Sequence, residues 1–306
     1  MASTPVKCAT VGIVGRTNGG KSTLVNRLVG EKVSIVSPVV QTTRNTIRAI
    51  LDEPRGQLVL TDTPGLHKAE SKLGSLINKM ARRAAADVDV LVLVFDVSEK
   101  PRLEDDGWMR RILADENPRP CIFFLNKCDR DERFDDDFHA LWKSIQEETG
   151  VTREVQVIRG SAATGDGCAA LTDALFALAT PGERLYDPEI LSDYPRRLAM
   201  ADIVREKIFL MLKDELPHDV GVRVDSFSEN PGRWHVEMTL LVVRESQKPI
   251  VIGPGGRTIR RIRLAAQKEI AEQYGVAVVL DLWVKVDKNW ATNNLTLRQM
   301  GCVGEV

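Results

Sequence analysis

The chain of 306 residues has 42 basic and 43 acidic side chains, a formal net charge of −1 and a hydrophobic content of 43%. This length is enough for two domains with separate cores, and the composition is typical of a globular protein rather than a disordered one. The balanced charge excludes a basic surface over the whole molecule, so any surface for nucleic acid must be local.

Cysteine and histidine usage argues against disulfides and against a zinc site. The five cysteines form no C-x-x-C pair, and the four histidines show no spacing typical of metal ligands. We therefore expect a reduced, cytoplasmic protein. No stretch of the sequence resembles a signal peptide or a membrane span. Nothing in the sequence supports a peripheral membrane contact, and we expect a monomer.

The first 180 residues alternate short apolar runs with longer amphipathic segments. This alternation is typical of a mostly parallel, doubly wound sheet with helices on both faces, so we predict an α/β domain over residues 1–180. Ligands of such sheets bind beyond the carboxyl ends of the strands. The predicted strands are 9–14, 46–51, 57–61, 88–95, 121–125 and 155–158, and the predicted helices are 21–29, 73–86, 105–114, 136–148 and 169–179.

A different order of elements follows residues 181–195, which are rich in proline and acidic residues and which we interpret as a linker. The order α-β-β-α-α-β then predicts a small α+β domain over residues 196–290, and residues 291–306 are expected to form a tail. The elements predicted here are a helix at 196–212, strands at 220–227 and 234–245, a helical segment at 250–256, a basic helix at 257–274 and a strand at 277–286.

A glycine-rich loop between the first predicted strand and the first predicted helix reads G-x-x-x-x-G-K-[ST], from Gly15 to Ser22. Its two glycines let the backbone curl so that successive N–H groups point inward, and the following helix presents its positive end. Lys21 can then reach the β- and γ-phosphates, and the Ser22 hydroxyl can bind Mg²⁺. The motif predicts a nucleotide-phosphate site formed by Asn18, Gly19, Gly20, Lys21, Ser22 and Thr23.

Two further segments have the residue types that a γ-phosphate and its Mg²⁺ require. Asp62 ends a predicted strand and suits a water-mediated contact with Mg²⁺, and the N–H of Gly65 suits the γ-phosphate. A threonine between the first helix and the second strand can bind Mg²⁺ when the γ-phosphate is present and release it after hydrolysis, which would make this segment a switch. Thr42 and Thr43 are both candidates, and we select Thr43. The predicted metal ligands are therefore Ser22, Thr43 and Asp62.

The sequence NKCD, residues 126–129, follows an apolar run and predicts guanine specificity. The Asp129 carboxylate can accept hydrogen bonds from N1–H and from the 2-amino group of guanine, and adenine has neither donor. An adenine nucleotide would leave this carboxylate unpaired, and a site with such an unpaired group rejects the wrong ligand by about 10⁴-fold or more. Asn126 can bond the base edge and brace the phosphate loop, and the stem of Lys127 can cover the ring. Further residues predicted to contact guanine, through a backbone N–H, are Ser161 and Ala162.

Taken in order, these motifs resemble those of the Era family of GTPases. The resemblance rests on QTTR at 41–44, DTPGLH at 62–67, NKCD and SAATGDG at 161–167. It implies a P-loop GTPase that binds GTP, GDP and Mg²⁺ and hydrolyses GTP slowly, because Leu66 stands where other GTPases have a catalytic glutamine. In GTPases that resemble this chain, an asparagine at the position of Asn18 binds K⁺, which makes K⁺ a candidate cofactor; the alternative is that Asn18 only braces the loop. The candidate catalytic residues are thus Asn18, Lys21, Thr43 and Gly65.

A second glycine-rich loop, of the form G-x-x-G, lies at residues 253–256 between two predicted helical segments. Such glycines allow close approach of a phosphodiester chain, and the arginines that follow concentrate positive charge. Ile252, Ile259 and Ile262 can form an apolar floor for splayed bases. This half resembles the type II KH domain of the Era family, although family loops usually have a basic residue at the position of Pro254. The residues predicted to bind RNA are Ile252, Gly253, Pro254, Gly255, Gly256, Arg257, Arg260 and Arg261.

The family resemblance implies binding near the 3′ end of small-subunit ribosomal RNA and assistance in assembly of the small ribosomal subunit. We therefore expect a GTP-hydrolysing switch coupled to an RNA-binding domain. The alternative is a binding-only RNA scaffold with structural nucleotide and negligible turnover, because Thr17 and Gly19 replace a proline and a valine of the family and loosen the phosphate loop. A P-loop kinase is disfavoured by the guanine motif.

Overall fold

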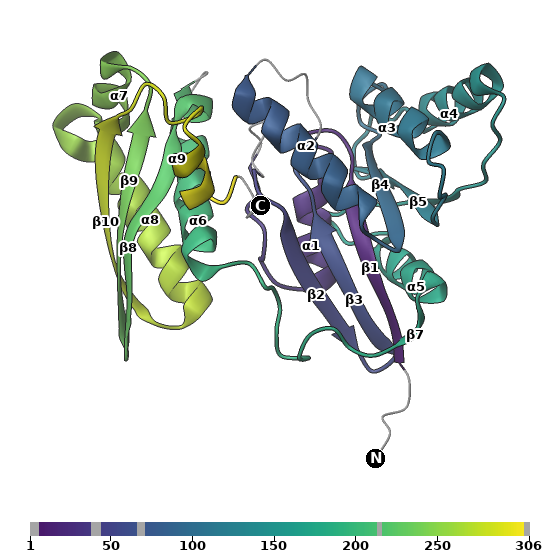
Figure 1. Cartoon of the computed structure of the whole chain (residues 1–306), viewed down its shortest axis with the longest axis horizontal. Coiled ribbons are helices and arrows are strands. Elements are labelled where there is room, and N and C mark those ends of the chain that lie inside the picture. Colours follow the sequence, from purple (N-terminus) through teal and green to yellow (C-terminus); the bar gives the residue numbers. More distant parts are fainter. Residues whose placement is uncertain (1–5, 38–43, 66–70, 213–215, 303–306) are drawn as a thin grey trace. The chain divides into compact units, whose positions relative to one another are not determined.

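The structure is a computed structural model in which the chain forms two compact units (Figure 1). Their main boundary in the sequence lies between Asp193 and Tyr194. Two short pieces of the N-terminal half, 35–37 and 71–76 among the described residues, group with the second unit. The residues that the structure describes are 6–37, 44–65, 71–212 and 216–302.

The first unit contains a seven-stranded sheet made of β1 (Val6–Val14), β2 (Ile47–Glu53), β3 (Gly56–Asp62), β4 (Val90–Asp96), β5 (Cys121–Asn126), β6 (Gln156–Arg159) and β7 (Thr180–Gly182). The strand order is β2-β3-β1-β4-β5-β6, and β7 pairs with β1 beside this path. Only β2 and β7 are antiparallel to their neighbours. The mostly parallel sheet confirms the predicted α/β fold.

Helices cover both faces of this sheet. Val92 of β4 packs in one apolar core with Leu24 and Leu171, whereas the next residue, Leu93, packs in the other core with Trp108. Because both faces are covered, β4 and β5 are continuous apolar runs instead of alternating patterns. The helices are α1 (Lys21–Val29), α2 (Lys72–Ala86), α3 (Leu103–Leu113), α4 (Asp135–Thr149) and α5 (Cys168–Leu178).

The segment interpreted as a linker is hydrogen-bonded to the first unit over much of its length. β7 lies at its beginning, and Gln57 of β3 donates to the Tyr186 carbonyl at 2.9 Å and accepts from the Tyr186 N–H at 3.0 Å. Further along, the Ile50 N–H of β2 donates to the Leu191 carbonyl at 2.9 Å. Because these bonds satisfy polar groups of β2, β3 and the segment itself, the first compact unit extends to Asp193.

The second unit is built from α6 (Arg196–Met211), β8 (Gly221–Asn230), β9 (Arg233–Val242), α7 (Lys248–Ile252), α8 (Arg257–Tyr274) and β10 (Ala277–Val286). Its sheet has the order β10-β9-β8, in which β9 is antiparallel to β8 and parallel to β10. Ile203, Ile262 and Leu280 share its core. This α-β-β-α-α-β order is the predicted one. Short 3₁₀ turns lie at Leu216–Asp219, Glu245–Gln247 and Pro254–Gly256.

The expected C-terminal tail contains a helix, α9 (Asn294–Gln299), that the sequence pattern did not predict. The Asn293 side chain caps it by accepting two backbone N–H bonds of its first turn. Leu297 is fully buried, and the indole of nearby Trp290 donates to the Asp219 carbonyl at 3.1 Å. A helix of six residues is too short to show a recognisable apolar period. Across the described ranges, no helix combines the length and apolarity needed to cross a membrane.

Candidate functional site

The phosphate loop connects β1 to α1 at the carboxyl edge of the sheet. Gly15 has a φ of 145°, and a Cβ there would lie 2.4 Å from the Val94 carbonyl oxygen. Gly20, directly before α1, has a φ of 95°, and a Cβ there would lie 2.2 Å from Asn126 Nδ2. Both positions therefore require glycine, because the loop packs tightly against the next strand and against the guanine motif.

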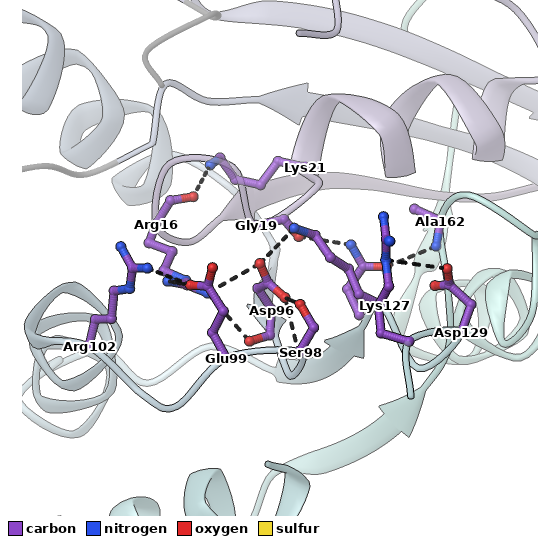
Figure 2. Close-up of polar contacts among 12 residues, drawn as sticks. Arg16, Gly19, Lys21, Asp96, Ser98, Glu99, Arg102, Lys127, Asp129 and Ala162 are labelled. Atoms are coloured by element: carbon purple, nitrogen blue, oxygen red, sulfur yellow. Dashed lines mark hydrogen bonds and ion pairs between the residues drawn. The ribbon is translucent and has the colours of Figure 1, made fainter. Parts of the chain in front are cut away.

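Lys21 lies inside this loop and is 6% exposed. Its Nζ donates to the Arg16 carbonyl at 2.7 Å, as Figure 2 shows. Burial lowers the pKa of Lys21 to about 8, although the charge of Asp62 opposes this shift. An ammonium group in such surroundings gains most from an anionic ligand, so the geometry suits a phosphate.

Ser22 and Asp62 form an oxygen-donor pair next to the loop. Ser22 Oγ donates to Asp62 Oδ2 at 2.7 Å. Asp62 is fully buried, burial raises its pKa, and its Oδ1 has no hydrogen-bond partner among the described residues. A buried carboxylate oxygen without a partner, beside a hydroxyl, fits the oxygen ligands that Mg²⁺ prefers. The third predicted ligand, Thr43, lies outside the described residues.

Asn126, at the end of β5, joins three segments of the site. Its Nδ2 donates to the Gly19 carbonyl at 2.8 Å, and its Oδ1 accepts from the Ala162 N–H at 2.8 Å. The next residue, Lys127, has a φ of 69°, which is uncommon for a residue other than glycine. The structure thus brings together the phosphate loop, the NKCD motif and the SAATGDG segment.

Asp129, the last residue of the NKCD motif, has a side chain that is 26% exposed. A hydrogen bond with buried Ser161 holds the pKa of Asp129 below its usual value. Arg27 of α1 fixes the same segment by donating to the carbonyls of Ala162, at 3.2 Å, and Ala163. Sequence reasoning missed Arg27, because an arginine in an amphipathic helix carries no signal of a contact so distant in sequence.

Charged side chains that no motif predicts surround Arg16 of the phosphate loop. Its guanidinium lies 3.2 Å from Asp96 Oδ2, 2.9 Å from Glu99 Oε2 and 3.7 Å from Asp105 Oδ2. The same Asp96 oxygen lies 2.6 Å from Lys127 Nζ. Asp105 is fully buried, and burial raises its pKa to about 6. These residues come from four segments, so only the fold brings them together.

Gly65, predicted to contact the γ-phosphate, lies against the phosphate loop. A Cβ at this position would come within 2.5 Å of the Thr17 backbone nitrogen, so only glycine allows the approach. Thr63, two residues earlier, anchors the segment by donating from Oγ1 to the Ile13 carbonyl at 2.8 Å. The residues of the motifs QTTR and DTPGLH that lie outside the described ranges are Gln41, Thr42, Thr43, Leu66 and His67.

The G-x-x-G loop of the second unit joins α7 to α8, and its three glycines have φ values of 74°, 59° and 74°. A Cβ at Gly253 would lie 2.1 Å from Thr258 Oγ1, whereas a Cβ at Gly255 or Gly256 would meet no described atom within 4 Å. The second half of the loop is therefore open, as binding of an RNA backbone requires. Exposed residues around it are Pro254, Arg257, Arg260 and Arg261.

The predicted apolar floor beside this loop is wrong in one residue. Ile262 is fully buried in the core of the second unit. It lies on the same face of α8 as Ala266 and Ile270, one and two turns further on, and this face packs on the sheet. Ile252 and Ile259 are partly exposed and remain candidates.

Three potential metal ligands also meet on the second sheet, although the histidine spacing predicted none. Ligand atoms of His235, Glu237 and Asp281 lie within 4.8 Å of one another, because β9 and β10 place Asp281 opposite Glu237. His235 Nε2 lies 3.0 Å from Asp281 Oδ2, and both side chains are nearly half exposed. A surface pair of this kind contributes little to stability.

Comparison with known proteins agrees with this arrangement. Residues 10–127 match the 50S ribosome-binding GTPase family, and residues 215–291 match the KH domain family. The chain is 37% identical over 296 residues to GTPase Era of Crocosphaera subtropica, which covers 96% of this chain and 92% of that protein. It is 36% identical over 292 residues to GTPase Era of Lacticaseibacillus paracasei, which covers 95% of each.

Two solved structures share the fold over nearly the whole length. Each has a TM-score of 0.88 and 30% sequence identity, and covers 97% of this chain and 99% of the other. One is a variant of Aquifex aeolicus Era bound to GDP·AlF4⁻, and the other is Era in complex with MgGDPNP and nucleotides 1506–1542 of 16S ribosomal RNA. Since identity and fold agree over both units, the chain belongs to the GTPase Era family.

Proposed function

We propose that the first unit binds and hydrolyses GTP, that the second binds single-stranded RNA, and that the nucleotide state switches the protein between conformations. The observation that carries the first part is the double contact of Asn126. Its side chain bonds Gly19 on one side and Ala162 on the other. The segments that would hold the phosphates and the guanine are therefore already joined in the structure.

The residue roles follow from this geometry. Lys21 exchanges the Arg16 carbonyl for a phosphate oxygen, and Asp129, whose pKa is lowered by Ser161, stays ionised at neutral pH to accept the two guanine donors. Mg²⁺, when bound, supplies positive charge opposite the β- and γ-phosphates. Ser22 and Asp62 would hold it, and Thr43 is proposed as a further ligand in the GTP state.

For hydrolysis we propose positioning in place of a catalytic glutamine. Leu66 stands at the position of the glutamine, so the Gly65 N–H and Lys21 would stabilise the charge that develops on the phosphates. Asn18 has a left-handed φ of 58° in the middle of the loop and is proposed to help hold K⁺; the alternative role is to brace the loop.

Turnover in KCl and NaCl at equal ionic strength separates these two roles of Asn18. The potassium role predicts about tenfold faster hydrolysis in KCl for the wild type, an advantage that Asn18→Ala removes. Equal rates of the wild type in the two salts would exclude a potassium ion and leave Asn18 as a structural residue.

The proposed RNA partner is the 3′ region of small-subunit ribosomal RNA, and the proposed role is assistance in assembly of that subunit in the cytoplasm. Support comes from the solved Era complex with 16S ribosomal RNA and from the open loop beside exposed Arg257. Five free cysteines suit a reduced compartment.

The function is tested on the full-length chain with two readouts. A variant with Gly255→Asp and Gly256→Asp should lose affinity for an RNA with the sequence of 16S nucleotides 1506–1542, because the carboxylates repel and crowd the phosphodiester chain. The same variant should hydrolyse GTP at the wild-type rate. Retained RNA affinity would contradict the role of the loop. A wild type that binds both ligands but shows no multiple turnover, with or without ribosomal subunits, would favour the binding-only scaffold.

A further inference from the structure

Asp96, at the end of β4, contacts both loops of the nucleotide site through one oxygen. Its Oδ2 lies 3.2 Å from the Arg16 guanidinium of the phosphate loop and 2.6 Å from Lys127 Nζ of the guanine motif. Its Oδ1 accepts from the Ser98 N–H at 3.1 Å and from the Ser98 hydroxyl at 2.6 Å. Figure 2 shows the carboxylate between these groups. It is thus fixed by Ser98 while it holds two cations.

The ion pair between Arg16 and Asp96 is shielded from water. Arg16 is 4% exposed and Asp96 is 3% exposed. Burial by itself would raise the pKa of Asp96, but hydrogen bonds from Lys127 and Ser98 outweigh it and hold the pKa below the usual value. The carboxylate is therefore ionised at neutral pH. Charges shielded from water interact more strongly than surface pairs. Because Asp96 contacts both cations through one oxygen, a displacement of Arg16 changes the strength of the ion pair between Asp96 and Lys127.

Both cations belong to segments whose positions decide the nucleotide contacts. The Arg16 carbonyl accepts the Nζ of Lys21 at 2.7 Å. Lys127 has a left-handed φ of 69° and lies between Asn126 and Asp129 in the guanine motif. A residue other than glycine stays in that conformation only where its surroundings enforce it, and the bond with Asp96 is one such restraint.

We propose that Asp96 is a positioning residue that couples guanine recognition to phosphate binding. The inference rests on the proposed function. Because Asp96 ties Lys127 to Arg16, the guanine motif and the phosphate loop are held in one arrangement, and each part of the nucleotide binds better when the other is in place. Loss of the carboxylate should therefore weaken both kinds of contact together.

The test compares Asp96→Asn with Asp89→Asn in the full-length chain. Asp89 is the matched control, because it lies directly before the other end of β4 and its Oδ2 accepts the Thr10 N–H at 2.7 Å. Two affinity ratios are measured by calorimetry. GDP over inosine diphosphate, which lacks the 2-amino group, reports guanine recognition, and GDP over GMP, which lacks the β-phosphate, reports phosphate binding.

We expect Asp96→Asn to lower both ratios by about tenfold, equivalent to ~1.4 kcal/mol each, and Asp89→Asn to change neither. A lower melting temperature with both ratios unchanged would overturn the proposal, because it would show a structural role only.

Ser98→Ala keeps the charge but loosens the carboxylate, so both ratios should fall by about threefold. If Asp96→Asn does not fold, unchanged ratios in Ser98→Ala overturn the proposal instead. Failure of the proposed function is distinct, because the wild type would then show no preference for GDP.

Discussion

The two glycine-rich loops of this chain are built in opposite ways. The phosphate loop is enclosed: Gly20 packs against Asn126, and Lys21 is buried within the loop. The G-x-x-G loop is open, since a Cβ at Gly255 or Gly256 would meet no described atom within 4 Å. The same residue type thus permits close packing in one loop and close approach of a partner in the other.

The difference follows from the ligands that the two loops suit. A nucleotide is small, so selectivity requires donors and acceptors that are placed in advance and shielded from water. An RNA strand extends beyond any single pocket, and its phosphates are attracted by exposed arginines without enclosure. The enclosed site therefore holds buried charges with shifted pKa values, such as Lys21 and Asp105, whereas Arg257 beside the open loop is exposed.

Breaking the enclosed site at its proposed guanine contact should have the largest effect. Asp129→Asn should lower GTP affinity by about 10³-fold and shift preference toward xanthosine triphosphate, because the carbonyl at position 2 of xanthine needs a donor. Titration with both nucleotides measures the shift. Asp131→Asn is the control, an exposed acidic residue two positions further on. Unchanged GTP affinity in Asp129→Asn would refute the guanine assignment.

The same substitution in the two loops should have unequal effects. Gly20→Ala should lower GTP affinity by about 10²-fold, because its Cβ would displace Asn126 and the left-handed φ adds strain. Gly255→Ala causes no steric clash and adds only backbone strain of about 1 kcal/mol, so RNA affinity should fall less than about tenfold. Binding assays on both full-length variants give the comparison, and a larger loss in Gly255→Ala would show that the second loop is enclosed as well.

Buried charge in the enclosed site should also appear as a pH dependence of stability. Burial raises the pKa of Asp105 to about 6, above the usual ~3.9 of the unfolded chain. As the pH falls from 7.5 to 4.5, the folded state takes up a proton that the unfolded state does not. The free energy of unfolding of the wild type should therefore rise relative to that of Asp105→Asn, by about 2 kcal/mol. Urea unfolding of both proteins across this range tests the sign, and parallel curves would contradict it.

RNA binding at the open loop should depend on salt concentration through the exposed arginines, and this is the smallest of the four effects expected here. Arg260→Gln should reduce the slope of log affinity for RNA against log salt concentration by about 0.7. The variant makes one phosphate contact fewer than the wild type, so its binding releases fewer counterions. Arg263 on the same helix is the control, since its guanidinium is within 3.5 Å of the Leu280 carbonyl and is partly buried. Equal slopes for wild type and Arg260→Gln would remove Arg260 from the RNA contact.

Much of the fold and of the nucleotide site could be predicted from the sequence, because both depend on local chemistry. Apolar runs that are covered on both faces, as in β4 and β5, are recognisable in any context. The glycines at Gly15 and Gly20 follow from the close approach that a phosphate loop needs, and Gly275 directly follows the end of the helix predicted at 257–274. All three glycines have a positive φ, a backbone conformation that glycine adopts without steric cost, so the residue type itself indicates the turn.

Contacts between distant segments could not be predicted in the same way. Asn126 and Gly19 are 107 residues apart, and the Arg16–Asp96–Lys127 cluster joins three strand ends that only the sheet order places side by side. An ion pair needs complementary charge at short distance, and 85 charged side chains allow too many pairings for the sequence to select one. The sequence alone therefore determined which chemistry each loop can perform, and the tertiary structure decided which side chains hold those loops in place.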